Sequence, residues 1–212
     1  MIASRKNRWI PLLIIIGMAV ILFCFFYADA YISKLCRGFS YPLRNYVKIG
    51  SRMLSPPFHI AFWPVLYLIA KYRKNNSRIL CFSREIFYSL LLSLPLVYGM
   101  KIGFGRARPE LLVNNIYGFY FMMQNHHYHS FPSGHAAVAI CLLMTLVRNF
   151  PKLRIIWITL FLFLSSSRVL LNYHYASDVV ATATICYMLE KFIVRKYRDL
   201  KKRKSDLYNP IS

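Results

Sequence analysis

Acidic residues are scarce in this sequence, which has only 7 Asp and Glu against 28 Lys and Arg in 212 residues. Charged residues of both signs make up 17% of the chain, whereas 57% of its residues are hydrophobic. Because a typical soluble domain has about 25% charged residues, this composition excludes an ordinary water-exposed surface. It indicates a lipid bilayer as the solvent.

The surplus of positive charge, +21 at pH 7, lacks the clustering expected of a nucleic-acid-binding face. The Lys and Arg residues fall instead between long apolar runs, where membrane proteins carry flanking charge. The sequence therefore predicts the membrane bilayer as a partner and no nucleic acid.

Cysteine pairs with the spacing of a metal site are lacking too. The five cysteines are odd in number, and four of them lie inside apolar runs, so they are interpreted as buried or lipid-facing hydrophobes. The sequence also has no repeat of fixed period and no low-complexity linker. Residues 1–212 are therefore predicted to form a single domain.

Long apolar runs are what the sequence has instead. A helix needs roughly 20 mostly apolar residues to cross the hydrocarbon layer of a membrane. Six runs approach this length, at about 9–28, 53–70, 82–100, 133–149, 153–171 and 177–194. The predicted fold is all-α, a six-transmembrane-helix bundle with its active site at the extracytoplasmic membrane face.

Two of these runs have unusual features. Arg5, Lys6 and Arg8 precede the first run, and Ala28-Asp29-Ala30 resembles a signal-peptidase site, so a cleaved signal peptide is the alternative to a retained helix. The apolar core is long for a signal peptide, which favours the retained helix. The second run is interrupted by Pro56, Pro57, His59 and Pro64, which neighbouring membrane helices can accommodate.

The orientation follows from the distribution of positive charge. Six spans place both termini on one side, and 19 of the 28 Lys and Arg fall on that side against 9 on the other. By the positive-inside rule both termini are predicted to be cytoplasmic. The basic cytoplasmic tail over 195–212 fixes this orientation, and binding of anionic lipid head groups is its alternative role.

Three short motifs stand at the extracytoplasmic ends of the predicted spans. They cover residues 101–109, 132–135 and 167–178. Each of their charged side chains, taken alone, would be interpreted as an interfacial anchor or a hydrogen-bonded polar group. The predicted topology, however, gathers three cations, two histidines and a carboxylate at one membrane face.

Phosphate transfer accounts for such a set of residues. A phosphoryl group in transfer spreads negative charge over three oxygens, and fixed positive charge stabilises it. Lys101, Arg108 and Arg168 supply three cations, and Arg suits bidentate contact with phosphate. Ser133 and Gly134 begin the fourth span, so free backbone N–H groups there are expected to point at the same anion.

The two histidines supply a nucleophile and a proton donor. His174 and Asp178 are four residues apart, so in a helical turn the carboxylate is expected to accept a hydrogen bond from one ring nitrogen. The other nitrogen is then free to attack phosphorus. His135 is expected to protonate the leaving oxygen and then to activate water, and no metal or cofactor is predicted.

These residues resemble the three-part signature of the type 2 phosphatidic acid phosphatase superfamily. The matching positions are Lys101, Arg108 and Pro109, then Pro132, Ser133, Gly134 and His135, then Ser167, Arg168, His174 and Asp178. The resemblance implies a metal-independent phosphatase with a phosphohistidine intermediate, in which His174 is the nucleophile, Asp178 orients it and His135 is the general acid. It also implies phosphate binding by Lys101, Arg108, Ser133, Gly134 and Arg168.

Two further features lie outside the signature. Arg106 is predicted to support the phosphate-binding residues from behind or to contact a lipid head group, with a plain interface anchor as the alternative. His126, His127 and His129 end an aromatic segment that is interpreted as a flap shaping substrate entry. A metal site is the alternative there, and the crowded spacing of the histidines disfavours it.

Six spans indicate that the substrate is itself a lipid. The resemblance favours a bacterial inner-membrane enzyme with a periplasmic active site acting on lipid A phosphate, with undecaprenyl pyrophosphate, phosphatidylglycerol phosphate and phosphatidic acid as alternatives. A multi-pass transporter is the alternative of another class, as is a catalytically inactive lipid-binding member of the family. The sequence carries no indication of an oligomeric state.

Overall fold

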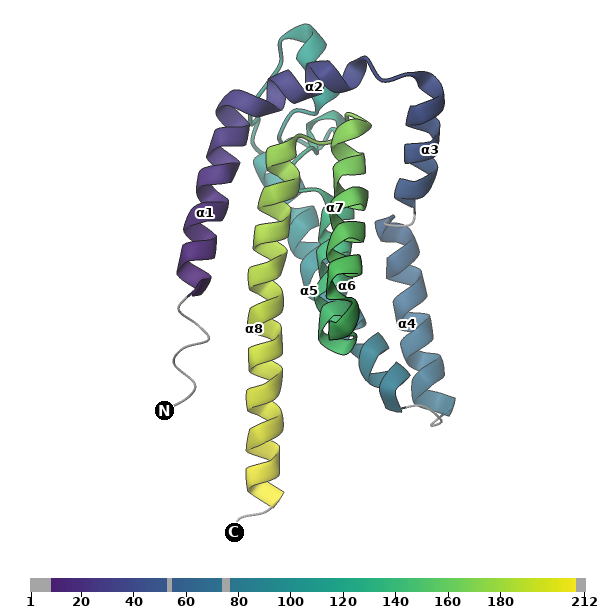
Figure 1. The fold of residues 1–212 in the computed structure, drawn as a ribbon. Coiled ribbons are helices and arrows are strands. Elements are labelled where there is room, and N and C mark those ends of the chain that lie inside the picture. The colour runs from purple at the N-terminus through teal and green to yellow at the C-terminus, as the bar shows by residue number, and fades with distance from the viewer. Residues whose placement is uncertain (1–8, 53–54, 74–76, 209–212) are drawn as a thin grey trace.

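The computed structural model describes residues 9–52, 55–73 and 77–208, and the regular elements in that part are helices apart from one isolated β-bridge. The axes of the long helices are roughly parallel, and α2 lies across one end of the bundle (Figure 1). The α-helices are α1 (Trp9–Phe23), α2 (Asp29–Arg37), α3 (Tyr41–Ser51), α4 (Pro56–Arg73), α5 (Ser77–Phe104), α6 (Gly134–Asn149), α7 (Arg154–Leu170) and α8 (Ala176–Tyr208). The short elements are the π-helix η2 (Cys24–Ala28) and the 3-10 helices η4 (Pro109–Asn114), η5 (His126–Tyr128) and η6 (Pro151–Leu153).

Within the described residues, each of the six apolar runs of the sequence corresponds to a helix. They correspond in order to α1 with η2, α4, α5, α6, α7 and α8, so the all-α fold class is confirmed. The sequence did not indicate α2 and α3, which lie between the first two runs. In α2 the residues Asp29, Ser33 and Cys36 are buried, and this spacing places them on one face of the helix.

Four helical stretches in the described part of the chain are long and apolar enough to cross a membrane: Ile14–Arg37, Arg44–Arg73, Ile79–Phe104 and Pro151–Leu170. Helix α6 is apolar but has only 16 residues, which corresponds to about 24 Å at 1.5 Å per residue. The prediction of six spans therefore goes beyond what helix length and composition show.

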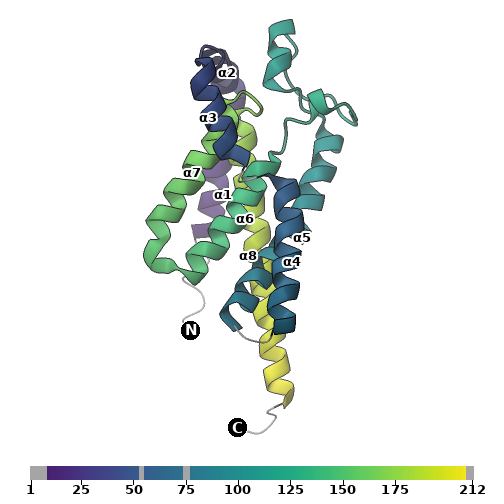
Figure 2. The same ribbon diagram turned by 90° about the vertical axis from the view of Figure 1, so that its right-hand side faces the viewer.

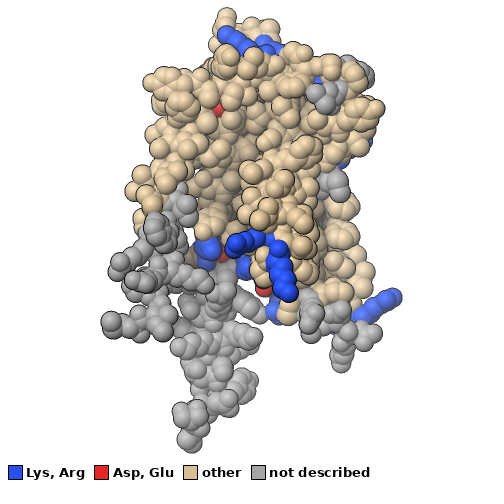
Figure 3. All heavy atoms as spheres, viewed as in Figure 1, with Lys and Arg blue, Asp and Glu red and all other residues tan. Residues whose placement is uncertain are grey.

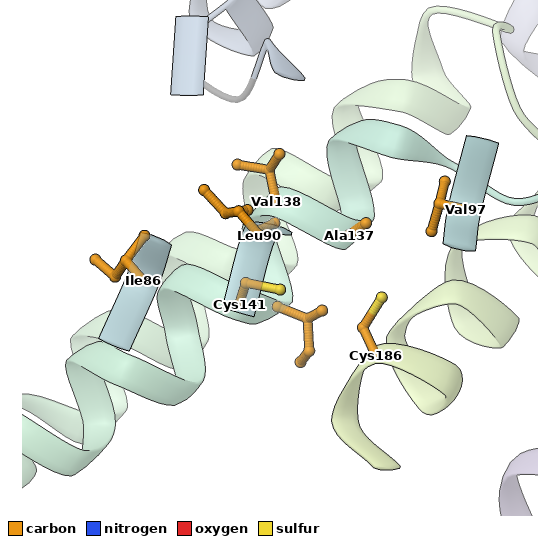
Figure 4. Close-up of a cluster of buried hydrophobic side chains, with 9 residues drawn as sticks. Ile86, Leu90, Val97, Ala137, Val138, Cys141 and Cys186 are labelled. Carbon is orange, nitrogen blue, oxygen red and sulfur yellow. The ribbon is translucent and has the colours of Figure 1, made fainter. Parts of the chain in front are cut away.

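Helix α6 is the centre of the bundle and packs against α5, α7 and α8. Its first half is small and buried, with Ala136, Ala137 and Ala139 at most 4% exposed. Small side chains let helix backbones approach closely, which is how membrane helices associate without a hydrophobic drive from water. Figure 4 shows the resulting cluster, in which Ile86, Leu90 and Val97 of α5 meet Ala137, Val138 and Cys141 of α6 and Cys186 of α8.

The outer surface carries a broad apolar band. Large exposed hydrophobic side chains occur along the helices, including Ile15 of α1, Val65 of α4, Leu91 of α5 and Phe163 of α7. In Figure 3, Lys and Arg lie above and below this band on the face shown. An apolar surface of this extent exceeds what soluble proteins expose and indicates contact with lipid.

The connections that carry the three motifs meet at one end of the bundle. Figures 1 and 2 place the α5–α6 connection and the α7–α8 turn at this end, together with α2. Helix α1 begins and α8 ends toward the opposite end (Figure 1). Side chains of α8 beyond residue 192, including those of the basic tail, lie outside the described part.

Candidate active site

The first motif leaves the last turn of α5 as an extended segment that organises the outer loop. Arg106 forms an isolated antiparallel bridge with Phe119, and the Ala107 N–H donates to the Gly118 carbonyl at 3.0 Å. On its other side the Arg108 N–H donates to the His127 carbonyl at 2.8 Å, and the Ser130 N–H to the Arg106 carbonyl at 3.0 Å. The segment 105–108 therefore joins both arms of the loop that leads to the second motif.

Gly105 makes this geometry possible. Its φ of +55° lies in the left-handed region, and a Cβ there would lie 2.1 Å from the Tyr120 carbonyl oxygen. The Gly105 carbonyl accepts from the Tyr120 N–H at 3.0 Å. Only glycine combines this φ with so close an approach of two backbones.

Three cations from different elements surround both histidines. Lys101 lies in the last turn of α5, Arg108 ends the extended segment and Arg168 lies in the last turn of α7. His135 and His174 each lie within electrostatic range of these same three cations. The structure therefore brings together the two imidazoles and the three positive charges that the sequence placed at one face.

Lys101 and Arg168 are each held by a contact that leaves donor groups for a ligand. Lys101 Nζ donates to the His129 carbonyl at 2.9 Å. Arg168 Nη1 donates to Ser51 Oγ at 3.2 Å, and its guanidinium lies 4.6 Å from the centre of the Tyr173 ring. Burial lowers the pKa of Arg108, the expected direction for a cation kept from water where an anion is to bind.

His174 lies in the turn between α7 and α8 and is 4% exposed. Its Nδ1 lies 2.5 Å from the Ser130 carbonyl oxygen. A carbonyl only accepts, so Nδ1 carries the proton and Nε2 keeps its lone pair. Burial, followed by the charges of Lys101, Arg168 and Arg108, lowers the pKa of His174 well below its usual value, which maintains this neutral, nucleophilic form.

His135 approaches the site from the first turn of α6. Besides the three cations, His59 of α4 lies within electrostatic range of His135. His59 Nδ1 accepts from Trp63 Nε1 at 2.8 Å. A Cβ added to Gly134 would lie 3.3 Å from Pro56 Cγ, so the N-terminus of α4 packs directly against the second motif.

The predicted hydrogen bond between Asp178 and His174 is wrong. Asp178 Oδ2 accepts from Ser130 Oγ at 2.6 Å and from the Tyr175 N–H at 2.9 Å. Helix α8 begins at Ala176, so His174 precedes the helix and the spacing of four residues does not place the two side chains on one helical face. Ser130 connects them instead, since its carbonyl contacts His174 and its hydroxyl contacts Asp178.

The second motif differs in part from the prediction of free backbone donors. The Ser133 N–H donates to Thr182 Oγ1 at 2.8 Å, and Ser133 Oγ caps α6 by accepting from the Ala136 N–H at 3.4 Å. Within the described residues, the N–H groups of Gly134 and His135 have no protein partner. Those two groups at the start of α6 are therefore the ones that can face an anion.

Arg106 is buried, at 1% exposure, and so does not contact a lipid head group or anchor at an interface. It lies between two carboxylates, with Nη1 2.5 Å from Asp178 Oδ1 and Nη2 2.8 Å from Asp29 Oδ2. Burial alone would lower the pKa of Arg106, but Asp178 and Asp29 outweigh it and raise that pKa. Arg106 thus contacts Asp178 of the third motif, and its support of the phosphate-binding residues stays a prediction.

Aromatic rings enclose the Arg106 guanidinium. The ring centres of Tyr175, Phe25, Phe119 and Tyr117 lie 4.6 to 5.7 Å from it. Burial raises the pKa of Tyr117 to about 12, so its hydroxyl keeps its proton and donates to the Phe25 carbonyl at 2.5 Å. The cage fixes the orientation of the guanidinium toward its two carboxylates.

Sequence reasoning missed Asp29, Ser130 and Ser177 as members of this cluster. Asp29 had a signal, because it is one of only 7 acidic residues and follows an apolar run. Serines carry no such signal, and their partners lie far away along the chain, Ser130 48 residues from Asp178 and Ser177 148 residues from Asp29.

Two of the three histidines before the second motif have polar partners for their side chains, and His126 packs on the His127 ring with 3.9 Å between the ring centres. His127 Nδ1 pairs with Glu110 Oε1 at 2.7 Å, and His129 Nε2 lies 2.9 Å from the Met123 carbonyl. Within residues 9–52, 55–73 and 77–208, no group of three or more His, Cys, Asp or Glu is placed to hold a metal ion. The histidines therefore tie the loop to itself and to η4.

Comparisons with known proteins found similar chains. Two curated proteins named lipid A 1-phosphatase are similar to the chain: one from Rhizobium johnstonii at 30% identity over 97 residues, or 45% of this chain and 40% of that protein, and one from Rhizobium etli at 34% over 103 residues, or 47% and 41%. The matches thus span about two fifths of each relative's length.

A solved structure shares the fold. The crystal structure of the first transmembrane PAP2-type phosphatidylglycerolphosphate phosphatase, from Bacillus subtilis, covers 90% of this chain and 96% of its own with a TM-score of 0.58. At 20% identity the likeness concerns the fold alone. The family model of the PAP2 superfamily matches residues 82–202. Since this range is more than half of the chain and contains all three motifs, the chain belongs to the PAP2 superfamily.

Proposed function

We propose that this chain is an integral membrane lipid phosphate phosphatase that acts through a phosphohistidine at His174. The observation that supports this best is the state of that side chain. It is buried within electrostatic range of three cations. Its Nδ1–H donates a hydrogen bond to the Ser130 carbonyl, which leaves the Nε2 lone pair free. A neutral imidazole held in one tautomer beside an anion site is suited to attack phosphorus.

The reaction proceeds in two displacements. In the first, a bond forms between His174 Nε2 and phosphorus while the bond from phosphorus to the lipid oxygen breaks, and His135 gives its proton to that oxygen. In the second, His135 takes a proton from water, whose oxygen bonds to phosphorus as the nitrogen–phosphorus bond breaks. The products are a lipid alcohol, or a lipid monophosphate from a pyrophosphate, and inorganic phosphate.

Fixed side-chain charge stabilises the phosphoryl group in both steps. Lys101, Arg108 and Arg168 surround the equatorial oxygens. The N–H groups of Gly134 and His135 add two donors at the N-terminus of α6. We propose that these groups meet the charge requirement of the reaction and that no metal takes part.

The proposed setting is the inner membrane of a bacterium, crossed six times by one domain over residues 1–212. The apolar surface band and the helical state of all six apolar runs support the six spans. The distribution of Lys and Arg supports termini in the cytoplasm and a motif end at the periplasmic face.

Lipid A phosphate is the proposed substrate, because two similar proteins are named lipid A 1-phosphatase. The alternatives are undecaprenyl pyrophosphate, phosphatidylglycerol phosphate and phosphatidic acid. All four present a phosphate on an apolar anchor, which is what a cationic site beside an apolar band accommodates.

The test is a phosphate-release assay on purified chain in detergent with EDTA present. Wild type is expected to release phosphate from one of these four lipids, with lipid A fastest, and to retain ³²P in a form labile to acid. His174→Ala is expected to reduce release to the background while keeping the melting temperature and elution volume of wild type. Unchanged turnover of His174→Ala would contradict the mechanism, and a transporter would release no phosphate at all.

A further inference from the structure

Asp29 joins the N-terminal part of the chain to the candidate active site. It is the first residue of α2, follows the π-helix η2 directly and is 1% exposed. Its Oδ2 pairs with Arg106 Nη2 at 2.8 Å, and its Oδ1 accepts from the Ser177 N–H at 3.0 Å. Ser177 Oγ also donates to Asp29 Oδ2. A buried carboxylate with three donors is fully engaged.

Asp29 and Asp178 hold the same segment from two sides. Asp178 accepts from the Tyr175 N–H at 2.9 Å, while Asp29 accepts from the Ser177 N–H. These two amides lie immediately after His174, where α8 begins. The two carboxylates thereby fix the backbone that carries the proposed nucleophile.

Arg106 couples the two carboxylates. Its guanidinium contacts both, and the side chains of all three residues are at most 2% exposed. The three together carry one net negative charge, directly behind a site with three positive charges. Because buried charges interact strongly, removal of one carboxylate changes the position of the segment that carries His174 and the electric field at its imidazole.

The connection continues to the imidazole itself. Asp178 Oδ2 accepts from Ser130 Oγ at 2.6 Å, and the Ser130 carbonyl lies 2.5 Å from His174 Nδ1. A displacement of Asp178 therefore moves the group that sets the tautomer of His174. Misplacement of a reacting group by about 1 Å costs on the order of 100-fold in rate.

We propose that Asp29 is a positioning residue for His174, acting through Arg106, Ser177 and Asp178. It lies outside residues 82–202, which the family model matches, so this role is carried by the chain's own N-terminal helices. The proposal depends on the proposed function of His174 as a nucleophile.

The test replaces Asp29 by its isosteric amide in the full chain. Asp29→Asn is expected to lower kcat and the rate of ³²P incorporation by about 10- to 100-fold, with KM within about twofold, because the groups that bind phosphate stay in place. Loss of one negative charge also disfavours protonated histidine, so the pH profile of kcat/KM is expected to move to lower pH. A merely looser fold would not move the profile in this way.

Two controls make the result decisive. Glu85→Gln removes a carboxylate from the other end of α5, where Glu85 is half-exposed and lies 3.4 Å from Arg148, and is expected to keep wild-type kcat and pH profile. If Asp29→Asn does not fold, Ser177→Ala removes the hydroxyl that donates to Asp29 Oδ2 and leaves the charges of Asp29, Arg106 and Asp178 in place. This variant is expected to fold and to lower kcat in the same direction.

Wild-type kcat and an unmoved pH profile in folded Asp29→Asn, or wild-type kcat in Ser177→Ala where Asp29→Asn does not fold, would overturn the proposal. That outcome differs from failure of the proposed function, in which wild type itself would release no phosphate or His174→Ala would remain active.

Discussion

The Nδ1–H of His174, the proposed nucleophile, donates its hydrogen bond to a backbone carbonyl and not to a carboxylate. The Ser130 carbonyl accepts from His174 Nδ1 at 2.5 Å, and the Ser130 hydroxyl donates to Asp178 Oδ2 at 2.6 Å. A neutral acceptor stabilises the imidazolium form less than a carboxylate in direct contact would. The tautomer of His174 is therefore fixed without raising its affinity for a proton.

The lowered pKa of His174 makes a prediction about stability. Burial and three cations keep this imidazole neutral in the folded state, whereas in the unfolded chain it gains a proton as pH falls below about 6.5. The unfolded state then binds more protons, so this residue lowers the free energy of unfolding by about 1.4 kcal/mol for each pH unit below that value. Its effect is absent above about pH 7.5.

The measurement compares wild type with His174→Gln by unfolding in mixed detergent at pH 8 and at pH 5.5. The difference between the two proteins at pH 8 sets the baseline, since neither state is protonated at His174 there. At pH 5.5 wild type is expected to have lost about 1.4 kcal/mol more than the variant. Parallel pH dependences would show that His174 takes up a proton in the folded protein.

At the scale of elements, the extended segment after α5 determines the site geometry through its glycine. Gly105→Ala is expected to be strongly destabilised and nearly inactive, because a Cβ would have both a positive φ of +55° and an approach of 2.1 Å to the Tyr120 carbonyl. The positive φ alone costs about 1–3 kcal/mol, and the clash would also separate the segment from the outer loop.

Two other glycines provide matched controls for this prediction. Gly118→Ala introduces strain without a clash, since its φ is +111° and nothing lies within 4 Å, and Gly103→Ala in α5 introduces neither. Melting temperature and phosphate release are expected to fall in the order Gly103→Ala, Gly118→Ala, Gly105→Ala. Equal values for the last two variants would show that the close backbone approach does not matter.

The helices and the meeting of the motifs could be predicted from the sequence, whereas the partners of Asp178 could not. Run length and charge placement determine membrane helices because the bilayer leaves few alternatives. The predicted pairing of Asp178 with His174 required a helix that already includes His174. Helix α8 begins only at Ala176, so the two side chains do not share a helical face. Helix boundaries are uncertain by a few residues in any sequence reading.

The N-terminal helices show the same limit for contacts far apart in sequence. Asp29 pairs with Arg106 and Ser177, which are 77 and 148 residues away, and no local pattern encodes such distances. The burial of Asp29 does bear on the signal-peptide alternative. Cleavage after Ala30 would remove this carboxylate and leave Arg106 with Asp178 as its one carboxylate partner.

At the scale of the whole molecule, charge and apolar surface are separated along the bundle axis. The motif end carries the buried cationic site, and the opposite end carries the ion pair of Arg148 with Glu190 at 2.8 Å. Between them the exposed surface is largely apolar. This separation is expected of a membrane protein whose two ends face water and whose middle is covered by lipid.

The two wet ends are expected to face opposite sides of the membrane, and cysteine labelling can test this. Met122 lies in the outer loop at the motif end and is 74% exposed, whereas Lys152 is an exposed residue of η6 at the other end of α6. In spheroplasts, Met122→Cys is expected to react with a membrane-impermeant maleimide at once. Lys152→Cys is expected to react only after permeabilisation, because 19 of the 28 Lys and Arg assign its side to the cytoplasm. The parent chain, with its five native cysteines, gives the background labelling. Reaction of both positions in intact spheroplasts would contradict a bundle that crosses the membrane between them. The reversed labelling pattern would place the phosphate site in the cytoplasm, where lipid A phosphate of the outer leaflet could not reach it.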